Sequence, residues 1–415
     1  RLRPRAHKFG GSSLADADRI RHVADLLLSE GEGPQITVVS AMQGVTDALI
    51  ALSETAAAGG EWHGPWDTLR VRHAEVAARL VAGADPALQG WLGDQFDTLR
   101  ELLQAIAVLR SPGRPAFERI QGLGEVWSAR MLQAHLVSRG ADTALLDARQ
   151  VLVVRHEELG VAVDWERSAA QLAKWRALHP QARVVATGFI ASSESGLPTV
   201  LGRNGSDYSG ALFAALFEAD ELHIWTDVDG VLSADPRLVP EAVALPALSY
   251  REAFELAYFG ARVIHPQTLA PAMSRQLPIL IRNSFRPELP GTRIDARGAG
   301  GGPVKGLTLS PGLALVSLEG TGLIGVPGTA ERVFAALHAA KVSVVMISQG
   351  SSEHSICCVV RDADAALAAA ALRRAFDREL AAGQVQGVQA TGGVSVLAAV
   401  GDGMAGTPGV AARLF

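Results

Sequence analysis

Short β-branched runs alternate with longer stretches of helical periodicity over the first 285 residues of this chain. In the stretches 18–28 and 206–217, apolar residues recur every three or four positions, which is typical of a helix with one buried face. Strands that alternate with helices pair in parallel, because each helix crosses over the sheet before the next strand begins. We therefore predict an α/β domain with a mostly parallel sheet between helices. Its candidate strands are 36–39, 183–186, 222–225 and 278–281.

The composition of the sequence changes after residue 297. Residues 298–312 are rich in glycine and proline, which is the composition of an exposed linker. Beyond them, the order strand, helix, strand, strand, helix predicts an α+β unit with its helices on one face of an antiparallel sheet. We divide the chain into a first domain at 1–297, the linker, and a second domain at 313–390. The elements expected in the second domain are strands 313–318, 342–347 and 355–360 and helices 330–340 and 363–380.

The pattern that opens the second domain occurs twice. Residues 316–334 contain a strand, a glycine turn and the start of a helix, and residues 396–415 repeat this arrangement. The repeat stops at Phe415, well before the first copy of the helix would end. We therefore expect 391–415 to begin a second, incomplete copy of the domain, and we expect the chain to be a fragment.

Composition excludes several classes of function. The 38 Lys and Arg residues against 43 Asp and Glu residues leave a net charge of −5, which argues against a basic face for nucleic acid. No apolar run approaches the roughly 18 residues that a bilayer requires, so no membrane partner is expected. The two cysteines, Cys357 and Cys358, are adjacent in a candidate strand and point to opposite faces. A disulfide framework is thereby excluded, and a reducing, cytoplasmic location is expected.

A lysine at a strand end leads into a glycine loop at Lys8, Gly10 and Gly11. Glycine lets backbone amides approach phosphate oxygens, and a lysine adds a point charge. The GxxxxGK[ST] phosphate loop occurs nowhere in the chain, so this segment by itself is moderate evidence. The alternative is a tight strand-to-helix turn with a solvated lysine.

Two further strand-to-helix segments carry polar side chains. Ser40 and Thr46 either line a site or cap the following helix. Arg203 suits a carboxylate and Asp207 suits an ammonium, so together they could hold a zwitterion. The alternative is that these two residues pair with each other while Ser206 caps the helix.

An acidic segment follows the candidate strand 222–225. Its Asp227-Val228-Asp229-Gly230 sequence is like part of a calcium loop, but the acid that closes such a loop is absent and no helix precedes it. We predict no metal site built from protein side chains.

Taken in order, these motifs resemble those of aspartate kinases in the amino acid kinase superfamily. The segments that carry the resemblance are Lys8-Phe9-Gly10-Gly11-Ser12-Ser13, 40–47, Gly124-Glu125, 202–209, 226–237 and 259–266. Residues 348–356 and 400–404 resemble the paired ACT regulatory domains of bifunctional aspartokinase–homoserine dehydrogenases. The resemblance implies an amino acid kinase fold, a mostly parallel sheet sandwiched by helices, followed by an ACT-type domain.

The resemblance also implies an activity, the transfer of a phosphoryl group from MgATP to the β-carboxylate of L-aspartate. This is the first step of lysine, threonine and methionine biosynthesis. A carboxylate is already an ionised nucleophile at neutral pH, so the enzyme has mainly to align two anions and neutralise charge. The catalytic residues implied are Lys8, Arg203 and Asp207, and Ser40, Thr46, Glu125, Arg203 and Asp207 would bind aspartate. Nucleotide contacts are implied for Lys8, Gly10, Gly11, Ser12, Thr226, Asp227, Leu232, Arg237 and Arg262.

Two positions depart from the family pattern. Arg262 stands where a lysine is usual, and its planar guanidinium would contact a phosphate with a different geometry from that of a compact ammonium. Leu232 stands where a tyrosine is common, so a ring contact to the nucleotide is lost.

The ACT resemblance implies an amino-acid effector and a homo-oligomer. Its binding residues would be Gly325, Val326, Val344 and Gln349. Lysine-sensitive relatives carry an acid where this chain has Val345, and an apolar side chain cannot pair with a lysine ammonium. Threonine is therefore expected in preference to lysine.

Other functions remain open. The chain could be another amino acid kinase, acting on acetylglutamate, glutamate or a nucleoside monophosphate, or a non-catalytic amino-acid sensor. The glycine run 298–302 could suggest a dinucleotide dehydrogenase, but it follows no predicted strand and opens no helix.

Overall fold

The computed structural model describes residues 3–81, 85–158, 160–259, 263, 265–298, 300–321, 326–349 and 355–414, with residues 267–269 described by their backbone alone. It divides into two compact units. The first contains the chain up to residue 305 together with the residues from 401 onward, and the second contains residues 306–400.

An eight-stranded sheet forms the centre of the first unit, in the order β10-β12-β11-β9-β1-β2-β6-β3. All neighbouring strands are parallel except the antiparallel pair β11 and β12. The four predicted strands are confirmed to within two residues at each end. The strands are β1 (Arg5–Phe9), β2 (Gln35–Val39), β3 (Thr143–Leu146), β6 (Arg183–Thr187), β9 (Leu222–Thr226), β10 (Ala247–Ser249), β11 (Ile279–Asn283) and β12 (Thr292–Asp295).

A second, smaller sheet belongs to the same unit, in the order β5-β4-β7-β8. Its strands are β4 (Val153–Glu157), β5 (Gly160–Val163), β7 (Ile190–Ser193) and β8 (Pro198–Val200). The sequence patterns did not predict this sheet.

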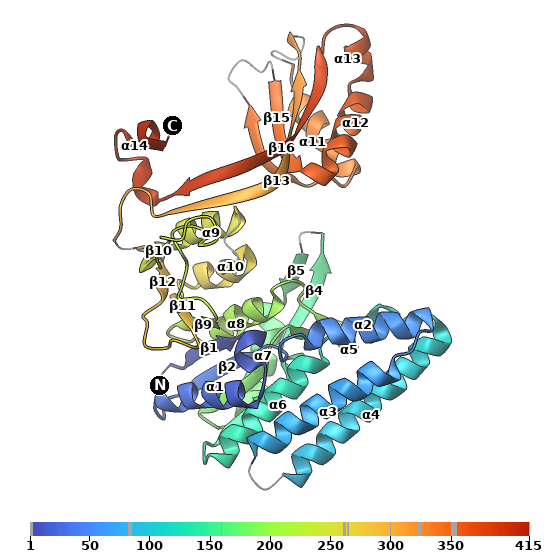
Figure 1. The fold of residues 1–415 in the computed structure, drawn as a ribbon, viewed down its shortest axis with the longest axis vertical. Coiled ribbons are helices and arrows are strands. Elements are labelled where there is room, and N and C mark those ends of the chain that lie inside the picture. Colours follow the sequence, from blue (N-terminus) through green and yellow to red (C-terminus); the bar gives the residue numbers. More distant parts are fainter. Residues whose placement is uncertain are drawn as a thin grey trace. The chain divides into compact units, whose positions relative to one another are not determined.

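Helices pack around the central sheet (Figure 1). The predicted helices 18–28 and 206–217 are confirmed as α1 and α8, and the long helices α3 and α4 lie side by side. The helices are α1 (Ala17–Ser29), α2 (Val45–Ala58), α3 (His63–Leu80), α4 (Pro86–Leu109), α5 (Arg114–Gln121), α6 (Leu123–Ser138), α7 (Trp165–Leu178), α8 (Gly205–Leu216), α9 (Tyr250–Tyr258) and α10 (Pro266–Ser274), with short 3-10 helices η1 (Gly11–Leu14) and η2 (Ala148–Gln150).

The main core lies on the face of the sheet that carries Phe9 and Trp225. These two rings stack in parallel with centroids 5.7 Å apart, and residues of α1, α2, α3, α4 and α6 join the same apolar cluster. Successive residues of a strand point to opposite faces, so Lys8 points away from this core. Strand β1 thus places Phe9 in the core and Lys8 on the opposite face, where α8 packs.

The second unit is the antiparallel α+β arrangement that the sequence predicts. Its sheet has the order β14-β15-β13-β16, and α11 and α12 contribute to its apolar core. Cys358 lies in this core and both cysteines are free. The elements are β13 (Gly306–Glu319), α11 (Thr329–Ala339), β14 (Val344–Gln349), β15 (Ser355–Arg361), η4 (Asp362–Asp364), α12 (Ala365–Ala375), α13 (Asp377–Ala381) and β16 (Gly387–Val400).

Two boundaries differ from the sequence-based division. Strand β13 begins at Gly306, inside the segment expected to be a linker, because residues 306–310 pair with residues 396–400 of β16. The expected helix 363–380 is divided into α12 and α13, since the chain leaves helical geometry at the fully buried Phe376. Residues 402–404 (η5) and 410–414 (α14) belong to the first unit.

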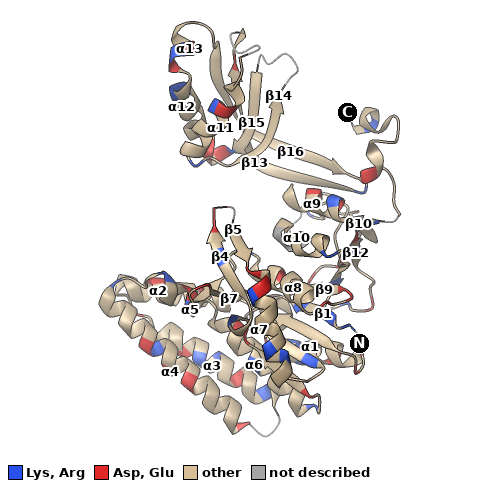
Figure 2. Cartoon of the chain, turned by 180° about the vertical axis from the view of Figure 1, so that it is seen from behind, with Lys and Arg blue, Asp and Glu red and all other residues tan. Residues whose placement is uncertain are grey.

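Charged residues of both signs are interspersed along α3 and α4 (Figure 2). Among the described residues, no helix is long and apolar enough to cross a membrane.

Candidate active site

A cavity of about 650 Å³ lies where β1 and β2 end and where α2, α6 and α8 begin. Eight residues singled out from the sequence line it, although they come from segments far apart in the chain. They are Lys8, Gly10, Gly11, Ser40, Thr46, Glu125, Arg203 and Asp207.

Lys8 is held in place from two directions. Its ammonium forms an ion pair with Asp207, with 2.6 Å between Nζ and Oδ1, and its side chain is only 10% exposed. A Cβ atom at Gly210 of α8 would lie 3.0 Å from Cβ of Lys8, so the absence of a side chain there lets the lysine stem pass the helix. Asp207 was expected to receive a substrate ammonium, and this role stays a prediction beside its ion pair with Lys8.

Glu125 is buried at the start of α6, with 3% of its surface exposed. Burial raises the pKa of its carboxyl to about 8, although hydrogen bonds from backbone N–H groups and the charge of Lys8 act in the opposite direction. Its Oε2 atom has no hydrogen-bond partner within the described part of the chain. The site therefore contains a carboxyl group that is protonated at neutral pH and faces a cavity.

Arg203 is exposed on the loop before α8, and no ion pair to it is formed by the residues that the structure describes. The alternative in which Arg203 pairs with Asp207 and Ser206 caps the helix is wrong, because Asp207 pairs with Lys8 and the N-cap of α8 is Asn204. The alternative in which Ser40 or Thr46 caps α2 is also wrong, because its N-cap is Gly44.

The helices that begin at the cavity have no side-chain caps. The N-cap residues are Gly10 of η1, Gly44 of α2, Gly122 of α6 and Asn204 of α8, and none of them caps its helix with a side chain. By contrast, α1, α4, α7 and α9 are each capped by their own Asp or Ser. Uncapped N-termini present free N–H groups and a partial positive charge, which favours anions.

Sequence reasoning missed several residues of the cavity. Gln43 and Asp47 lie inside a segment that was singled out, whereas Gln121 and Phe189 gave no local signal. Phe189 has φ +66°, a strained conformation for a bulky residue, and such strain is often stored at functional sites.

Of the residues expected to bind nucleotide, Lys8, Gly10 and Gly11 line this cavity, whereas Ser12, Thr226, Asp227, Leu232 and Arg237 do not. Thr226 ends β9 one residue beyond the pair Phe9 and Trp225, so it is close to the glycine loop. Arg237 makes a two-pronged contact with Asp235, with Nη2 and Oδ2 2.6 Å apart, and Leu232 forms a bridge with Ala244. Ser12 lies in η1. Arg262 is outside the described residues, and the nucleotide assignments stay predictions.

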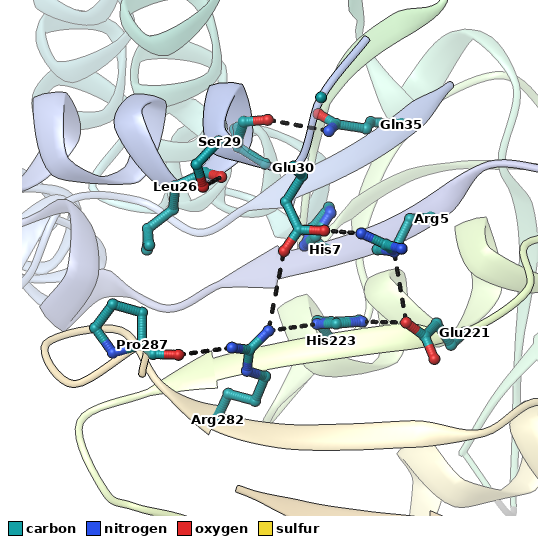
Figure 3. Close-up of polar contacts among 12 residues, drawn as sticks. Arg5, His7, Leu26, Ser29, Glu30, Gln35, Glu221, His223, Arg282 and Pro287 are labelled. Carbon is teal, nitrogen blue, oxygen red and sulfur yellow. Dashed lines mark hydrogen bonds and ion pairs between the residues drawn. The ribbon is translucent and has the colours of Figure 1, made fainter. Parts of the chain in front are cut away.

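A second polar cluster lies beside β1 and β9, on the sheet face opposite to Lys8 (Figure 3). Arg5, Glu30, Arg282, His223 and Glu221 form a closed ring of ion pairs and hydrogen bonds. His7 lies 5.1 Å from His223 between ring centroids and is fully buried, and its Nδ1 accepts a hydrogen bond from Trp225. Burial, followed by the neighbouring positive charges, lowers the pKa of His7.

The expected effector residues of the second unit are only partly described. Val326 is exposed, Val344 is half-buried at the start of β14, and Gln349 is exposed at the end of that strand. Gly325 lies outside the described residues.

Comparisons with known proteins identify the family of this chain. A model of the amino acid kinase family matches residues 5–283, which is more than half of the chain. The chain belongs to the amino acid kinase family. A model of the ACT domain matches residues 316–376, within the second unit.

Several curated relatives of this chain are bifunctional enzymes. The chain is 42% identical over 417 residues to bifunctional aspartokinase/homoserine dehydrogenase 1 of Zea mays, covering 99% of this chain and 45% of the relative. It is 36% identical to the corresponding Haemophilus influenzae enzyme, covering 99% of this chain and 51% of the relative. The chain thus spans about half the length of these relatives, and it matches their aspartokinase part.

Among solved structures, Escherichia coli aspartokinase III in complex with aspartate and ADP matches with a TM-score of 0.79 at 27% identity, covering 99% of this chain and 90% of that one. The same enzyme with lysine and aspartate matches with a TM-score of 0.74 at 28% identity, covering 96% and 87%. The predicted fold, an amino acid kinase fold followed by an ACT domain, is confirmed.

Proposed function

We propose that this chain is an aspartokinase, which transfers the γ-phosphoryl group of MgATP to the β-carboxylate of L-aspartate. The observation that carries the proposal is the cavity where Lys8, Arg203 and Glu125 meet four uncapped helix N-termini. Such a site offers two cations and free N–H groups to anions, and a buried carboxyl to an ammonium. An acidic amino acid beside a polyphosphate carries the complementary groups, which are anionic carboxylates and phosphates and one ammonium.

Some side chains of the cavity would bind aspartate, and others would contact the transferred phosphoryl group. Arg203 pairs with the α-carboxylate of aspartate, because its guanidinium has no other partner among the described residues. Glu125 receives the ammonium, while Ser40 and Thr46 hydrogen-bond the substrate. Lys8 neutralises negative charge on the phosphoryl group during its transfer, and the ion pair with Asp207 orients the ammonium of Lys8.

ATP would lie along the glycine loop, where the amides of Gly10 and Gly11 approach its phosphates. We place the adenosine near Thr226, Asp227 and Arg237, since β9 ends beside β1. No group of three metal-binding side chains occurs in the described part of the chain. Magnesium would be bound chiefly through phosphate oxygens and water, as its chemistry permits, and would neutralise phosphate charge.

The test is acyl-phosphate trapping with hydroxylamine. With ATP, magnesium and L-aspartate, the chain should give ADP and an aspartyl hydroxamate. Replacing Lys8 by Ala should lower kcat by about 1,000-fold or more, because the transferring phosphoryl group loses the positive charge that stabilises it. Lys174→Ala, on the exposed surface of α7, is the matched control and should leave kcat unchanged. Hydroxamate formed only from glutamate or acetylglutamate would refute the aspartate assignment.

Regulation is the second part of the proposal. The second unit would bind an amino acid near Val326, Val344 and Gln349, with threonine preferred over lysine. Oligomers would form through this unit, and the cytoplasm is the proposed location. Repeating the trapping assay with each amino acid should show inhibition by threonine alone, whereas inhibition by lysine would contradict the assignment.

A further inference from the structure

Two walls of the active-site cavity come from segments that are distant in the sequence. One wall is the junction of α5 and α6, which carries Gln121 and Glu125. The other is the loop that follows β8, which carries Arg203. The separation of these walls sets the distance between the groups that would hold the two ends of an amino acid.

A hydrogen-bonded chain connects the two walls. The hydroxyl of Thr199 on β8 donates to Oε2 of Glu118 on α5, at 2.8 Å, and Nε2 of His156 on β4 lies 2.7 Å from the same hydroxyl oxygen. The hydroxyl has one hydrogen, which goes to Glu118, so His156 must donate from Nε2. The other carboxylate oxygen of Glu118 accepts from Nε of Arg114 at 2.7 Å.

This chain of contacts is protected from water at its centre. Thr199 is 4% exposed and the side chain of Glu118 is 12% exposed. A hydrogen bond to a charged group is among the stronger ones in proteins, and it is stronger still where water is excluded. A close packing contact lies beside it, since a Cβ atom at Gly122 would come within 2.3 Å of Ile190 on β7. The two walls are therefore joined by a directional bond and by tight packing.

We propose that Thr199 and Glu118 are positioning residues that hold Arg203 and Glu125 at the separation required by the α-carboxylate and ammonium of the substrate. The inference rests on the proposed function and extends it to residues that do not line the cavity. Neither residue would contact aspartate. Loss of the bond would loosen recognition of the amino acid and leave the glycine loop, where ATP would bind, undisturbed.

Thr199→Val tests this, because it removes the hydroxyl and keeps the shape. We expect the KM for aspartate to rise about tenfold, which is the loss expected for a hydrogen bond to a charged group, while the KM for ATP and kcat stay within about twofold. Thr199→Ser retains the hydroxyl and should restore the KM. The matched control is Thr143→Val on β3, which is equally buried, whose hydroxyl donates to the nearby carbonyl of Ala141, and which should change neither KM.

Two outcomes would overturn the inference. An unchanged aspartate KM in Thr199→Val would show that the bond positions nothing. Equal increases in both KM values would show general loosening rather than a substrate-specific role. If Thr199→Val does not fold, Glu118→Gln takes its place, and the KM for aspartate should again rise while the KM for ATP stays unchanged. A wild-type chain that neither turns over nor binds aspartate in calorimetry would refute the proposed function itself, and this result is seen before any variant is made.

Discussion

The carboxyl group of Glu125 differs strongly in its pKa from an exposed glutamate. Burial raises its pKa to about 8, so it is neutral at pH 7 in the free protein. A substrate ammonium placed against it would favour the charged form, because an opposite charge lowers the pKa of a carboxyl group. Substrate binding and deprotonation of Glu125 are therefore coupled.

We predict that aspartate binding at pH 7 releases a proton from Glu125. Calorimetric titration in two buffers of different ionisation enthalpy should give apparent binding enthalpies that differ in proportion. In Glu125→Gln the difference should vanish, since no proton is available at that position. Identical enthalpies in both buffers for the wild-type chain would contradict the prediction.

At the scale of elements, the start of α6 lies unusually close to the loop before α2. A Cβ atom on Gly124 would come within 2.6 Å of Cβ of Ala41 and 2.9 Å of Cγ1 of Val45. Ser128 of α6 donates to the carbonyl of Ser40 at 2.6 Å. The helix that carries Glu125 and the loop that carries Ser40 are thus packed directly against each other.

Gly124→Ala should destabilise the first unit by about 1–3 kcal/mol, because the added methyl group overpacks this contact. It should also raise the KM for aspartate, since α6 must move away from the loop. Gly93→Ala is the matched control within α4, where a Cβ atom meets nothing within 4 Å. That variant should gain up to about 1 kcal/mol from helix propensity. Urea unfolding followed by tryptophan fluorescence measures both.

Strands β1 and β9 give a second prediction at this scale, because both carry a buried histidine. Burial is the first cause that lowers the pKa of His7 and of His223, so folding disfavours the protonated form of both. The unfolded chain takes up protons at these positions below about pH 6.5, whereas the folded chain takes them up only at lower pH. Stability is therefore lost as the pH falls below that value.

His7→Gln removes one of these groups. The free energy of unfolding of the wild-type chain should fall more steeply than that of the variant between pH 7 and about pH 5.5, if both are measured by urea titration. Parallel pH profiles would show that His7 is protonated equally in both states.

At the scale of the whole molecule, the polypeptide passes between the two units twice, after Lys305 and before Gly401. Both crossings are fastened within the first unit to Glu252 of α9. Its Oε2 forms an ion pair with Nζ of Lys305 at 2.8 Å, and its Oε1 accepts from the N–H of Asp402 at 2.9 Å. Burial alone would raise the pKa of Glu252, but these bonds outweigh it and lower the pKa.

Glu252→Ala should cost the first unit about 3–5 kcal/mol, because the buried ammonium of Lys305 loses its partner. All seven tryptophans lie in the first unit, so fluorescence reports on it alone. Asp67→Ala, which breaks the exposed pair with Arg70, is the control and should change stability by no more than about 0.5 kcal/mol. Because its pKa is lowered, the contribution of Glu252 is present above about pH 4.5 and is lost as the pH falls through the folded-state pKa.

Periodicity and strand-end motifs in the sequence determined the parallel sheet, the second antiparallel unit and the eight cavity residues found by motif. These signals are local, since a helix face or a glycine turn is encoded by neighbouring residues. Only the tertiary structure decided which groups meet. The pairing of Asp207 with Lys8, the burial of Glu125, the sheet that carries Thr199 and the strand at 306–310 all depend on partners distant in the chain. Such contacts leave no periodic trace in the sequence, because their free energy arises only when the distant segments pack together.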